Sequence, residues 1–308
     1  MRIHPLRTYS RLRYAPFLCQ VVVTRRCNLS CAYCSEYDKT SEPVPLDTLL
    51  ERVDKVTELG SFGIEFTGGE PLLHPDLSAV ISHAAQKKQF KMVGMITNAY
   101  LLTEKTVEQF NEAGLTDMQV SIDAVVPRED TVKALKPVRS RLKMIARKAK
   151  FKVTLSGVVG TAAPYEEVEE VILFAKEHGF RPRILLVHGD DGQLQPPPEQ
   201  LRDYRKAQKL IGKHWKDFID YREKLISKGK APFRCRAGSR YLYIDEFGTV
   251  RWCAHTAETF GKQLMAYDGV DLKREFYRTK DCNAHCTLGC ARSSSMVDGL
   301  FPQDDRLT

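Results

Sequence analysis

The stretch CNLSCAYC at residues 27–34 places three cysteines in one short loop, directly after the apolar run FLCQVVV at residues 17–23. A structural zinc site takes four ligands, and no fourth Cys or His follows within reach of the loop. Three thiolates can instead hold three irons of a four-iron cluster and leave the fourth iron open. We therefore predict an iron–sulfur cluster that binds a further molecule here. Zinc and three unrelated cysteines are the alternatives.

The cysteines of the chain fall into two groups. Of the nine, four lie within residues 19–34 and five within 235–290, with none in the 200 residues between. An odd number without an export signal favours metal binding or catalysis over a disulfide framework. Cys19 lies inside the apolar run and is predicted to be a small buried residue rather than a ligand. Two metal-binding regions are the simplest interpretation.

The composition is that of a globular protein. The chain has 308 residues, 43% hydrophobic and 28% charged, and a net charge of +8. No run approaches the ~18 apolar residues of a membrane span, and the basic start MRIHPLRTYSRLRYAPF lacks the apolar core of a signal peptide. The positive charges are spread out and not interleaved with aromatics, so nucleic acid is an improbable partner. A cytoplasmic protein without membrane contact is expected.

Six apolar, β-branched runs alternate with helical patterns. The predicted helices cover residues 46–59, 103–114 and 164–179. Such alternation is typical of βα units and a parallel sheet. Six units over about 170 residues predict an α/β fold with a partial (β/α)6 TIM-like barrel rather than a full eight-fold one. The predicted strands are residues 17–23, 62–66, 91–96, 118–122, 151–159 and 183–187.

The chain changes character after the sixth predicted strand. A Gly- and Pro-rich loop, HGDDGQLQPPPEQ, is followed by a charged helical stretch from about Glu199 to Lys228, and RYLYIDEFGTVRWC predicts a β-hairpin turning around Asp245 to Gly248. At the mouth of the predicted barrel, His188, Asp190 and Asp191 are candidate substrate contacts, with an ordinary Asx-turn loop as the alternative. The predicted division is a core barrel (1–195), a linking helix (196–232) and a C-terminal cluster region (233–308).

Four motifs in order make the chain resemble the radical S-adenosylmethionine (radical SAM) enzymes. The loop matches the family's CxxxCxxC motif, including the aromatic Tyr33, and the second strand ends in GGEP at residues 68–71. The segment TNAYLL at 97–102 is similar to the family's TNG element, with Ala99 in place of glycine. VSIDAV at 120–125 is similar to its SxD element. The matches lie on the expected strands within residues 18–190.

This resemblance implies the roles of the site residues. Cys27, Cys31 and Cys34 would hold the [4Fe–4S] cluster that reductively cleaves SAM to a 5′-deoxyadenosyl radical. A Gly-Gly backbone can approach the SAM amine closely because no Cβ intervenes. Polar side chains would contact the ribose, and Tyr33 would lie near adenine. The implied SAM-binding residues are Tyr33, Gly68, Gly69, Glu70, Asn98, Ser121 and Asp123.

The second cysteine group resembles the SPASM/Twitch extension that follows many radical SAM barrels. CRAGSRYLYIDEFGTVRWC at 235–253 is followed by CNAHCTLGC at 282–290, but five cysteines are too few for the full SPASM pattern and their spacing departs from it. A Twitch-like region with one auxiliary [4Fe–4S] cluster is predicted, with zinc as the alternative and one thiol spare. The spare thiol is either a hydrogen donor or inert. The candidates are Cys235, Cys253, Cys282, Cys286 and Cys290, four of which would be ligands, Cys235 and Cys253 first among them.

The implied function is oxidation or rearrangement of a peptide or small polar metabolite, with the auxiliary cluster relaying electrons. The implied partners are that substrate and an electron donor such as flavodoxin or ferredoxin. The alternatives are a radical SAM transferase that forms a carbon–carbon or adenosyl bond, a cofactor-biosynthesis cyclase, and a non-enzymatic scaffold. The cyclases of molybdenum-cofactor synthesis end in Gly-Gly, whereas this chain ends QDDRLT. The early cluster also leaves no room for an N-terminal leader-binding domain, so both observations weaken the corresponding hypotheses.

Overall fold

The computed structural model describes residues 13–34, 36–187, 194, 196–212, 222, 224–256, 259–296 and 298. One mixed sheet of nine strands runs through the described part of the chain, in the order β6-β5-β4-β3-β2-β1-β7-β8-β9. All neighbouring strands from β6 to β7 in this order pair in parallel. Strand β8 pairs antiparallel with both β7 and β9. The predicted substrate residues His188, Asp190 and Asp191 lie outside the described residues.

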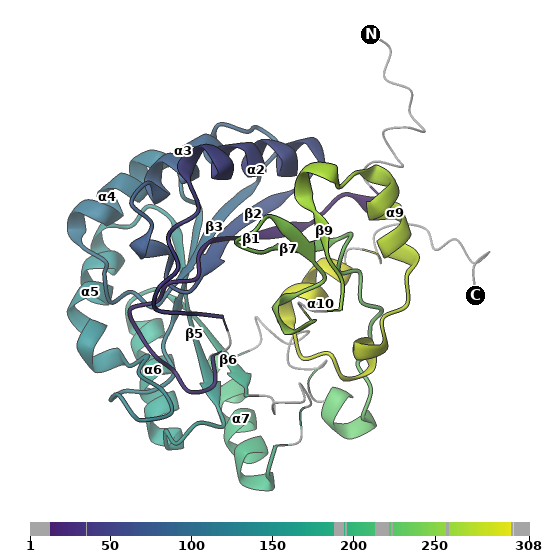
Figure 1. The fold of residues 1–308 in the computed structure, drawn as a ribbon. Coiled ribbons are helices and arrows are strands. Elements are labelled where there is room, and N and C mark those ends of the chain that lie inside the picture. The colour runs from purple at the N-terminus through teal and green to yellow at the C-terminus, as the bar shows by residue number, and fades with distance from the viewer. Residues whose placement is uncertain are drawn as a thin grey trace.

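The six predicted barrel strands are all present, and their ends differ from the predicted runs by a few residues. The sheet curves, with the helices along its outer side (Figure 1). The predicted α/β fold, a partial barrel with a C-terminal hairpin and helix, is confirmed. The strands are β1 (Leu18–Thr24), β2 (Gly63–Gly68), β3 (Met92–Thr97), β4 (Asp117–Ser121), β5 (Lys152–Val159) and β6 (Arg181–Leu186).

Five helices follow the first five strands in turn, and a sixth follows β6. Two of them, α3 and α5, were not predicted. The second of these buries Leu135, Val138, Leu142 and Ile145 at helical spacing, although its exposed face is strongly basic. The helices are α2 (Leu46–Glu58), α3 (Leu77–Ala85), α4 (Glu104–Ala113), α5 (Leu135–Lys148), α6 (Tyr165–Glu177) and α7 (Pro198–Ile211), the last ending at Gly212.

The two faces of the first strands have different environments. Val21, Ile64 and Phe66 belong to the large hydrophobic core that includes residues of α2 and α3. Cys19 is fully buried in the same core, as predicted. Because side chains alternate along a strand, Gln20 and Glu65 lie on the opposite, inner face. There they pair in register, and Gln20 Nε2 donates to Glu65 Oε2 at 2.6 Å.

The C-terminal part of the chain continues the barrel sheet. Strand β7 (Tyr241–Ile244) lies parallel to β1, and β8 (Thr249–Arg251) returns antiparallel to it, which confirms the predicted hairpin. Asp245 Oδ1 accepts hydrogen bonds from the turn amides, including Thr249 N at 2.8 Å. The later elements are β9 (Lys262–Gln263), α9 (Gly269–Tyr277) and α10 (Gly289–Met296), with short 3-10 turns at Pro71–Leu73, Ala254–Thr256, Leu264–Ala266 and Asp281–His285.

The predicted division into three regions stays a prediction. Strand β7 pairs with β1, so the barrel region and the C-terminal region share one sheet. A buried arginine, Arg52 of α2, strengthens this junction by donating to the carbonyl oxygens of Asp245 at 3.2 Å and Glu246 at 2.9 Å. A search of the described residues for a helix long and apolar enough to cross a membrane found none.

Candidate active site

The cysteine loop leaves the end of β1 and is closed at its base by backbone hydrogen bonds. Cys27 N donates to Asp38 O at 3.0 Å, and Asp38 N donates to Arg25 O at 2.8 Å. Asp38 Oδ1 in turn accepts from the amides of Thr40 and Ser41 at 3.0 and 2.8 Å. The loop therefore leaves and re-enters the fold at fixed points.

The Gly-Gly-Glu segment at the end of β2 packs directly on the start of this loop. Gly69 N donates to Thr24 O at 2.8 Å, and Glu70 N donates to Arg26 O at 2.9 Å. A Cβ on Gly68 would lie 2.0 Å from Thr24 O, and Gly68 also has a φ of +139°, which favours glycine. The two glycines are thus required by backbone packing as well as by any close approach of a ligand.

Glu70 is buried beneath this segment with an exposed fraction of 0%. Its carboxylate accepts from Asn98 N at 2.7 Å, Thr97 Oγ1 at 2.6 Å and Leu72 N at 3.1 Å. Burial raises its pKa to about 7, against the opposing effect of these hydrogen bonds. Through these contacts Glu70 connects the ends of β2 and β3 and positions Asn98.

A cavity of about 100 Å³ opens between the cysteine loop and the carboxyl ends of β2, β3 and β4. This is the edge at which parallel α/β proteins place their ligands. One cation that sequence analysis missed, Lys133, also lines the cavity. Of the predicted residues, the cavity brings together Cys27, Cys31, Cys34, Gly68, Gly69, Asn98 and Ser121.

Two predicted SAM contacts, Tyr33 and Asp123, contact each other. The Tyr33 hydroxyl donates to the Asp123 carboxylate, which also accepts from Thr131 Oγ1 at 3.3 Å. Lys133 Nζ lies 3.9 Å from Asp123 Oδ2 and 4.9 Å from the centroid of the Tyr33 ring. Burial raises the pKa of Asp123. Burial by itself would lower the pKa of Lys133. Asp123 and Tyr33 more than reverse this effect, so the pKa is raised and the ammonium stays charged.

Sequence offers no signal for Lys133, because no motif surrounds it. The segment after β4 leaves the sheet and returns through a bridge between Ala124 and Ala134, with Asp123 N donating to Lys133 O at 2.8 Å. This return brings the lysine to the cavity wall.

Arg25 neutralises carboxylates of the loop and the hairpin. Its Nη1 lies 2.9 Å from Glu36 Oε2 and its Nε lies 2.8 Å from Glu246 Oε2. The hydroxyl of Tyr243 also donates to Glu36. The arginine therefore connects the cysteine loop to β7 and its turn.

The donor set at the cavity suits a multi-iron group better than a single ion. Within the described ranges, no three His, Cys, Asp or Glu side chains are grouped to hold one metal ion. Three thiols nonetheless line one cavity together with glycine backbone and a lysine. A four-iron cluster bonds each thiolate to a different iron, so it needs them further apart than one zinc ion does. The residues present fit such a cluster.

Four thiols of the second cysteine group are close enough to influence one another's pKa. After burial, the neighbours that raise the pKa of Cys286 are Cys235, Cys253 and Cys282. Cys235, whose pKa burial raises to about 11, is in turn influenced by Cys253 and Cys282. Asn283 joins the two segments, because its side chain accepts from Cys235 N and donates to Phe233 O at 2.8 Å.

Cys290 has different surroundings. Gln20 Nε2 of β1 donates to its sulfur at 3.7 Å, and Tyr241 donates to the oxygen of the same Gln20. Burial and then Glu65 raise the pKa of Cys290 to about 11, and Cys253 adds a smaller increase. The fifth thiol therefore faces the inner side of the sheet, beside Gln20 and Glu65.

A sequence model of the radical SAM superfamily matches residues 21–204, which include every residue of the cavity. The chain belongs to the radical SAM superfamily. It is therefore a radical SAM enzyme, and its cofactors are a [4Fe–4S] cluster and S-adenosylmethionine, as the resemblance implied.

Two of its relatives are named as cyclases. A GTP 3′,8-cyclase of Clostridium botulinum is 26% identical over 271 residues, covering 77% of this chain and 81% of the relative. A PqqA peptide cyclase of Bradyrhizobium diazoefficiens is 31% identical over 113 residues, covering 36% and 29%.

Solved structures share the fold at lower identity. Streptococcus suis SuiB bound to its precursor peptide SuiA matches 90% of this chain and 71% of its own, with a TM-score of 0.68 and 15% identity. Native anSMEcpe with bound AdoMet matches 94% and 92%, with a TM-score of 0.60 and 17% identity.

Replacing Gly69 by alanine tests the packing of the glycine segment on the cysteine loop. The added methyl would lie 2.3 Å from Arg25 O and 2.4 Å from Arg26 O, which are backbone atoms that cannot move aside cheaply. We expect Gly69→Ala to lose roughly half of the iron bound after anaerobic reconstitution, because one of two four-iron sites is disrupted. Gly269→Ala is the control, because a Cβ there meets nothing within 4 Å. Equal iron content in both variants would contradict this role.

Proposed function

We propose that Cys27, Cys31 and Cys34 hold the cluster at which SAM is cleaved, and that the inner face of the barrel presents a peptide to the resulting radical. The observation that carries the first part is the convergence of three thiols, two glycines and a lysine on one cavity at the carboxyl edge of the sheet. A cluster held by Cys27, Cys31 and Cys34 would supply the electron for reductive cleavage of SAM to methionine and a 5′-deoxyadenosyl radical, which would take a hydrogen atom from the substrate.

Each cavity residue then has a distinct task. The backbone of Gly68 and Gly69 is open to the amino group of SAM, and the Lys133 ammonium offers the charge that its carboxylate requires. Asn98 and Ser121 supply polar groups for the ribose hydroxyls. Asp123 and Glu70 act indirectly, since the first holds Lys133 and Tyr33 and the second holds Asn98.

The inner polar group, which we define as Gln20, Glu65, Gln119 and Arg183, supports a peptide as the substrate. Gln119 accepts from Arg183 Nη1 at 2.7 Å, and Gln20 donates to Glu65 at 2.6 Å. Arg183 Nε is buried without a hydrogen-bond partner in the described part of the chain. A buried donor without a partner is costly, and a peptide carbonyl would satisfy it.

The charge of the inner polar group also favours a peptide substrate. Burial raises the pKa of the Glu65 carboxyl, and the hydrogen bond from Gln20 and the nearby Arg183 oppose this increase. A neutral amide backbone suits this balance better than a triphosphate, which the carboxylate would repel. The shared fold with SuiB, whose structure was solved with its precursor peptide, agrees with this assignment.

The auxiliary cluster is proposed to lie between Cys235, Cys253, Cys282 and Cys286, whose thiols affect one another's pKa. Four thiolates close a four-iron cluster, so it would exchange electrons rather than bind the substrate. Cys290 then remains as the spare thiol on the inner face, next to Gln20. Oxidation of the substrate is the net reaction that uses such an electron acceptor.

Replacing all three loop cysteines by alanine tests the catalytic cluster. We expect the reconstituted wild type to bind about eight irons and the Cys27/Cys31/Cys34→Ala variant about four, because only the auxiliary site remains. With dithionite and SAM, 5′-deoxyadenosine should form in the wild type alone. The electron paramagnetic resonance signal of the reduced wild type should change on adding SAM, whereas that of the variant should not. SAM cleavage at the wild-type rate in the variant would contradict the assignment of these three cysteines to the catalytic cluster.

Two single serine variants form a matched pair for the auxiliary cluster. We expect Cys253→Ser to lose about four irons and Cys290→Ser to keep the full number, because the thiols that raise the pKa of Cys286 include Cys253 but not Cys290. Iron and sulfide analysis with the resonance signal of the remaining cluster measures both. Loss of four irons from the Cys290 variant would place that thiol among the ligands instead.

A second candidate function is cyclisation of GTP. It is favoured by the 26% identity with the Clostridium botulinum GTP 3′,8-cyclase over 77% of this chain. In that case the inner polar group would have to accommodate a triphosphate next to Glu65.

Incubation with GTP separates the two candidates. We expect GTP to remain intact and the rate of 5′-deoxyadenosine formation to be unchanged when GTP is added to enzyme, SAM and dithionite, because Glu65 repels the phosphates. Liquid chromatography measures both compounds, and the Clostridium botulinum relative serves as the positive control. GTP consumption in proportion to 5′-deoxyadenosine would replace the peptide proposal with the cyclase.

A further inference from the structure

We infer that the basic pocket beside Cys235 is the docking surface for a small acidic electron-transfer protein of the flavodoxin class. The inference rests on the proposed function in one respect, because it takes the auxiliary cluster to lie at Cys235. It adds the place where the partner binds, and it assigns this role to residues that are outside both cluster motifs.

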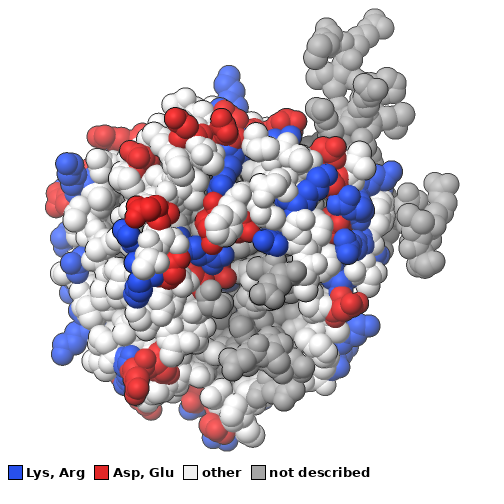
Figure 2. All heavy atoms as spheres, in the orientation of Figure 1, with Lys and Arg blue, Asp and Glu red and all other residues white. Residues whose placement is uncertain are grey.

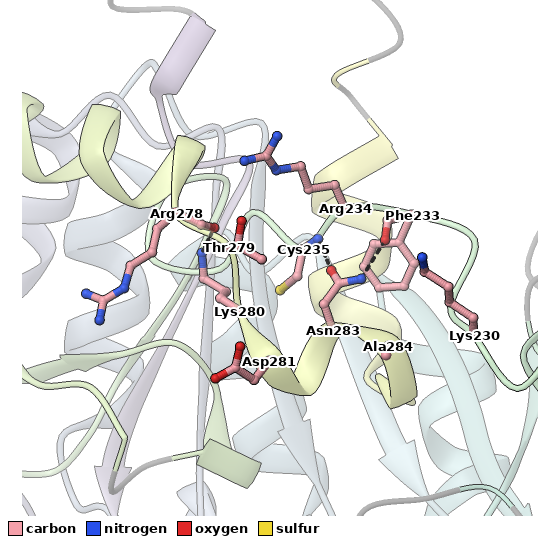
Figure 3. Close-up of a pocket in the computed structure, with 10 residues that line it drawn as sticks. All are labelled: Lys230, Phe233, Arg234, Cys235, Arg278, Thr279, Lys280, Asp281, Asn283 and Ala284. Atoms are coloured by element: carbon pink, nitrogen blue, oxygen red, sulfur yellow. Dashed lines mark hydrogen bonds between the residues drawn. The ribbon is translucent and has the colours of Figure 1, made fainter. Parts of the chain in front are cut away.

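The pocket has a volume of about 540 Å³ and is formed by two segments, residues 230–235 and 278–284. Three exposed cations, Lys230, Arg234 and Arg278, lie around it, and the buried Lys280 lies within it. Asp281 is the one acidic side chain of the lining. In Figure 3 the Cys235 thiol lies between Lys280 and Asn283, with the two guanidinium groups extending to one side and Lys230 to the other.

Contacts hold three of the four positive charges in place, those of Lys280, Arg278 and Arg234. Lys280 is only 3% exposed, and its ammonium donates to the carbonyl oxygens of Glu275 at 2.9 Å and Arg278 at 3.2 Å. The Arg278 guanidinium lies 5.0 Å from the centroid of the Trp252 ring, and Arg234 donates to the carbonyl of Tyr277. Fixed charges cost less entropy when a partner binds.

One buried carboxylate offsets part of this charge without reaching the surface. Glu275 has an exposed fraction of 0%, and it contacts Arg278 at 3.5 Å and Trp252 Nε1 at 2.8 Å. The surface presented to solvent is therefore basic. Figure 2 shows Lys and Arg side chains gathered over α9 and the segment that follows it.

The position of the pocket suits electron exchange. Cys235 lines it, and Cys282, another proposed ligand, is an exposed residue of the second segment. The linings of this pocket and of the catalytic cavity have no residue in common. A protein bound here would lie against the auxiliary cluster while the substrate occupies the barrel.

The charge of the surface selects the kind of partner. Complementary charges raise the rate of association by steering the encounter, and this effect weakens as salt is added. An acidic flavoprotein gains from four cations around one pocket, whereas a basic or neutral partner does not. A small polyanion such as a triphosphate could use the same charges, and the experiment is designed to detect it.

The test is the binding of purified oxidised flavodoxin to the reconstituted full-length enzyme, followed by biolayer interferometry. We expect Arg234→Glu/Arg278→Glu to lower the association rate constant by about tenfold or more, and the wild-type rate to fall steeply from low to physiological salt. The control is Lys143→Glu/Arg147→Glu, which changes the net charge equally at exposed positions of α5 on the other side of the sheet. Its association rate constant should stay within about twofold of the wild-type value. Lys230→Glu, a single exposed change, guards against misfolding of the double variant and should lower the rate in the same direction.

The outcomes separate the docking surface from the cluster beneath it. Full iron content with equal flavodoxin binding by the pocket variants and the α5 variant would overturn the docking surface and leave the cluster proposal intact. Loss of flavodoxin binding in the pocket variants alone would support it, whatever the iron ligands prove to be. Binding of inorganic triphosphate that the pocket variants lose, without any effect on flavodoxin, would identify a phosphate site and also overturn the inference.

Discussion

The site depends on one backbone contact, the packing of the Gly68–Glu70 segment on the end of β1. Two hydrogen bonds, from Gly69 N to Thr24 O at 2.8 Å and from Glu70 N to Arg26 O at 2.9 Å, fix where the cysteine loop begins. The same segment places Glu70 under the end of β3, where its carboxylate positions Asn98. The same three residues thus fix the cysteine loop, the glycine backbone and the end of β3. A displacement of any of these parts would change the shape of the whole cavity.

Strand β1 also connects this cavity to the C-terminal cysteines. It lies between β2 and β7 in the sheet, and its two faces have different tasks. One face belongs to the hydrophobic core, and on the other Gln20 contacts Glu65, Cys290 and Tyr241. Because both cysteine regions are attached to a buried strand, the distance between the two proposed clusters is set by the sheet and not by a flexible linker.

Sequence was sufficient for features that a short segment encodes by itself. The strands, the hairpin and the motif residues of the cavity follow from local pattern, and all six barrel strands are found where they were predicted. Lys133 could not be found, because its position depends on a loop that returns through Ala124 and Ala134. The contact between Gln20 and Cys290 was equally hidden, since cysteine spacing carries no information on which sulfur faces Gln20. Helix α5 was missed although its buried residues recur at helical spacing, because its basic face dominates the sequence.

The relatives of this chain catalyse different reactions on a shared scaffold, so the scaffold alone does not determine the substrate. What differs between a nucleotide and a peptide is charge. A triphosphate requires an excess of cations, whereas an amide backbone requires paired donors and acceptors. On the inner face of this barrel, the Glu65 carboxylate accompanies the Arg183 guanidinium, and the buried Nε of that arginine is a donor without an acceptor among the described residues. A separate group of cations lies around the pocket beside Cys235, where it can attract a partner without affecting the choice of substrate.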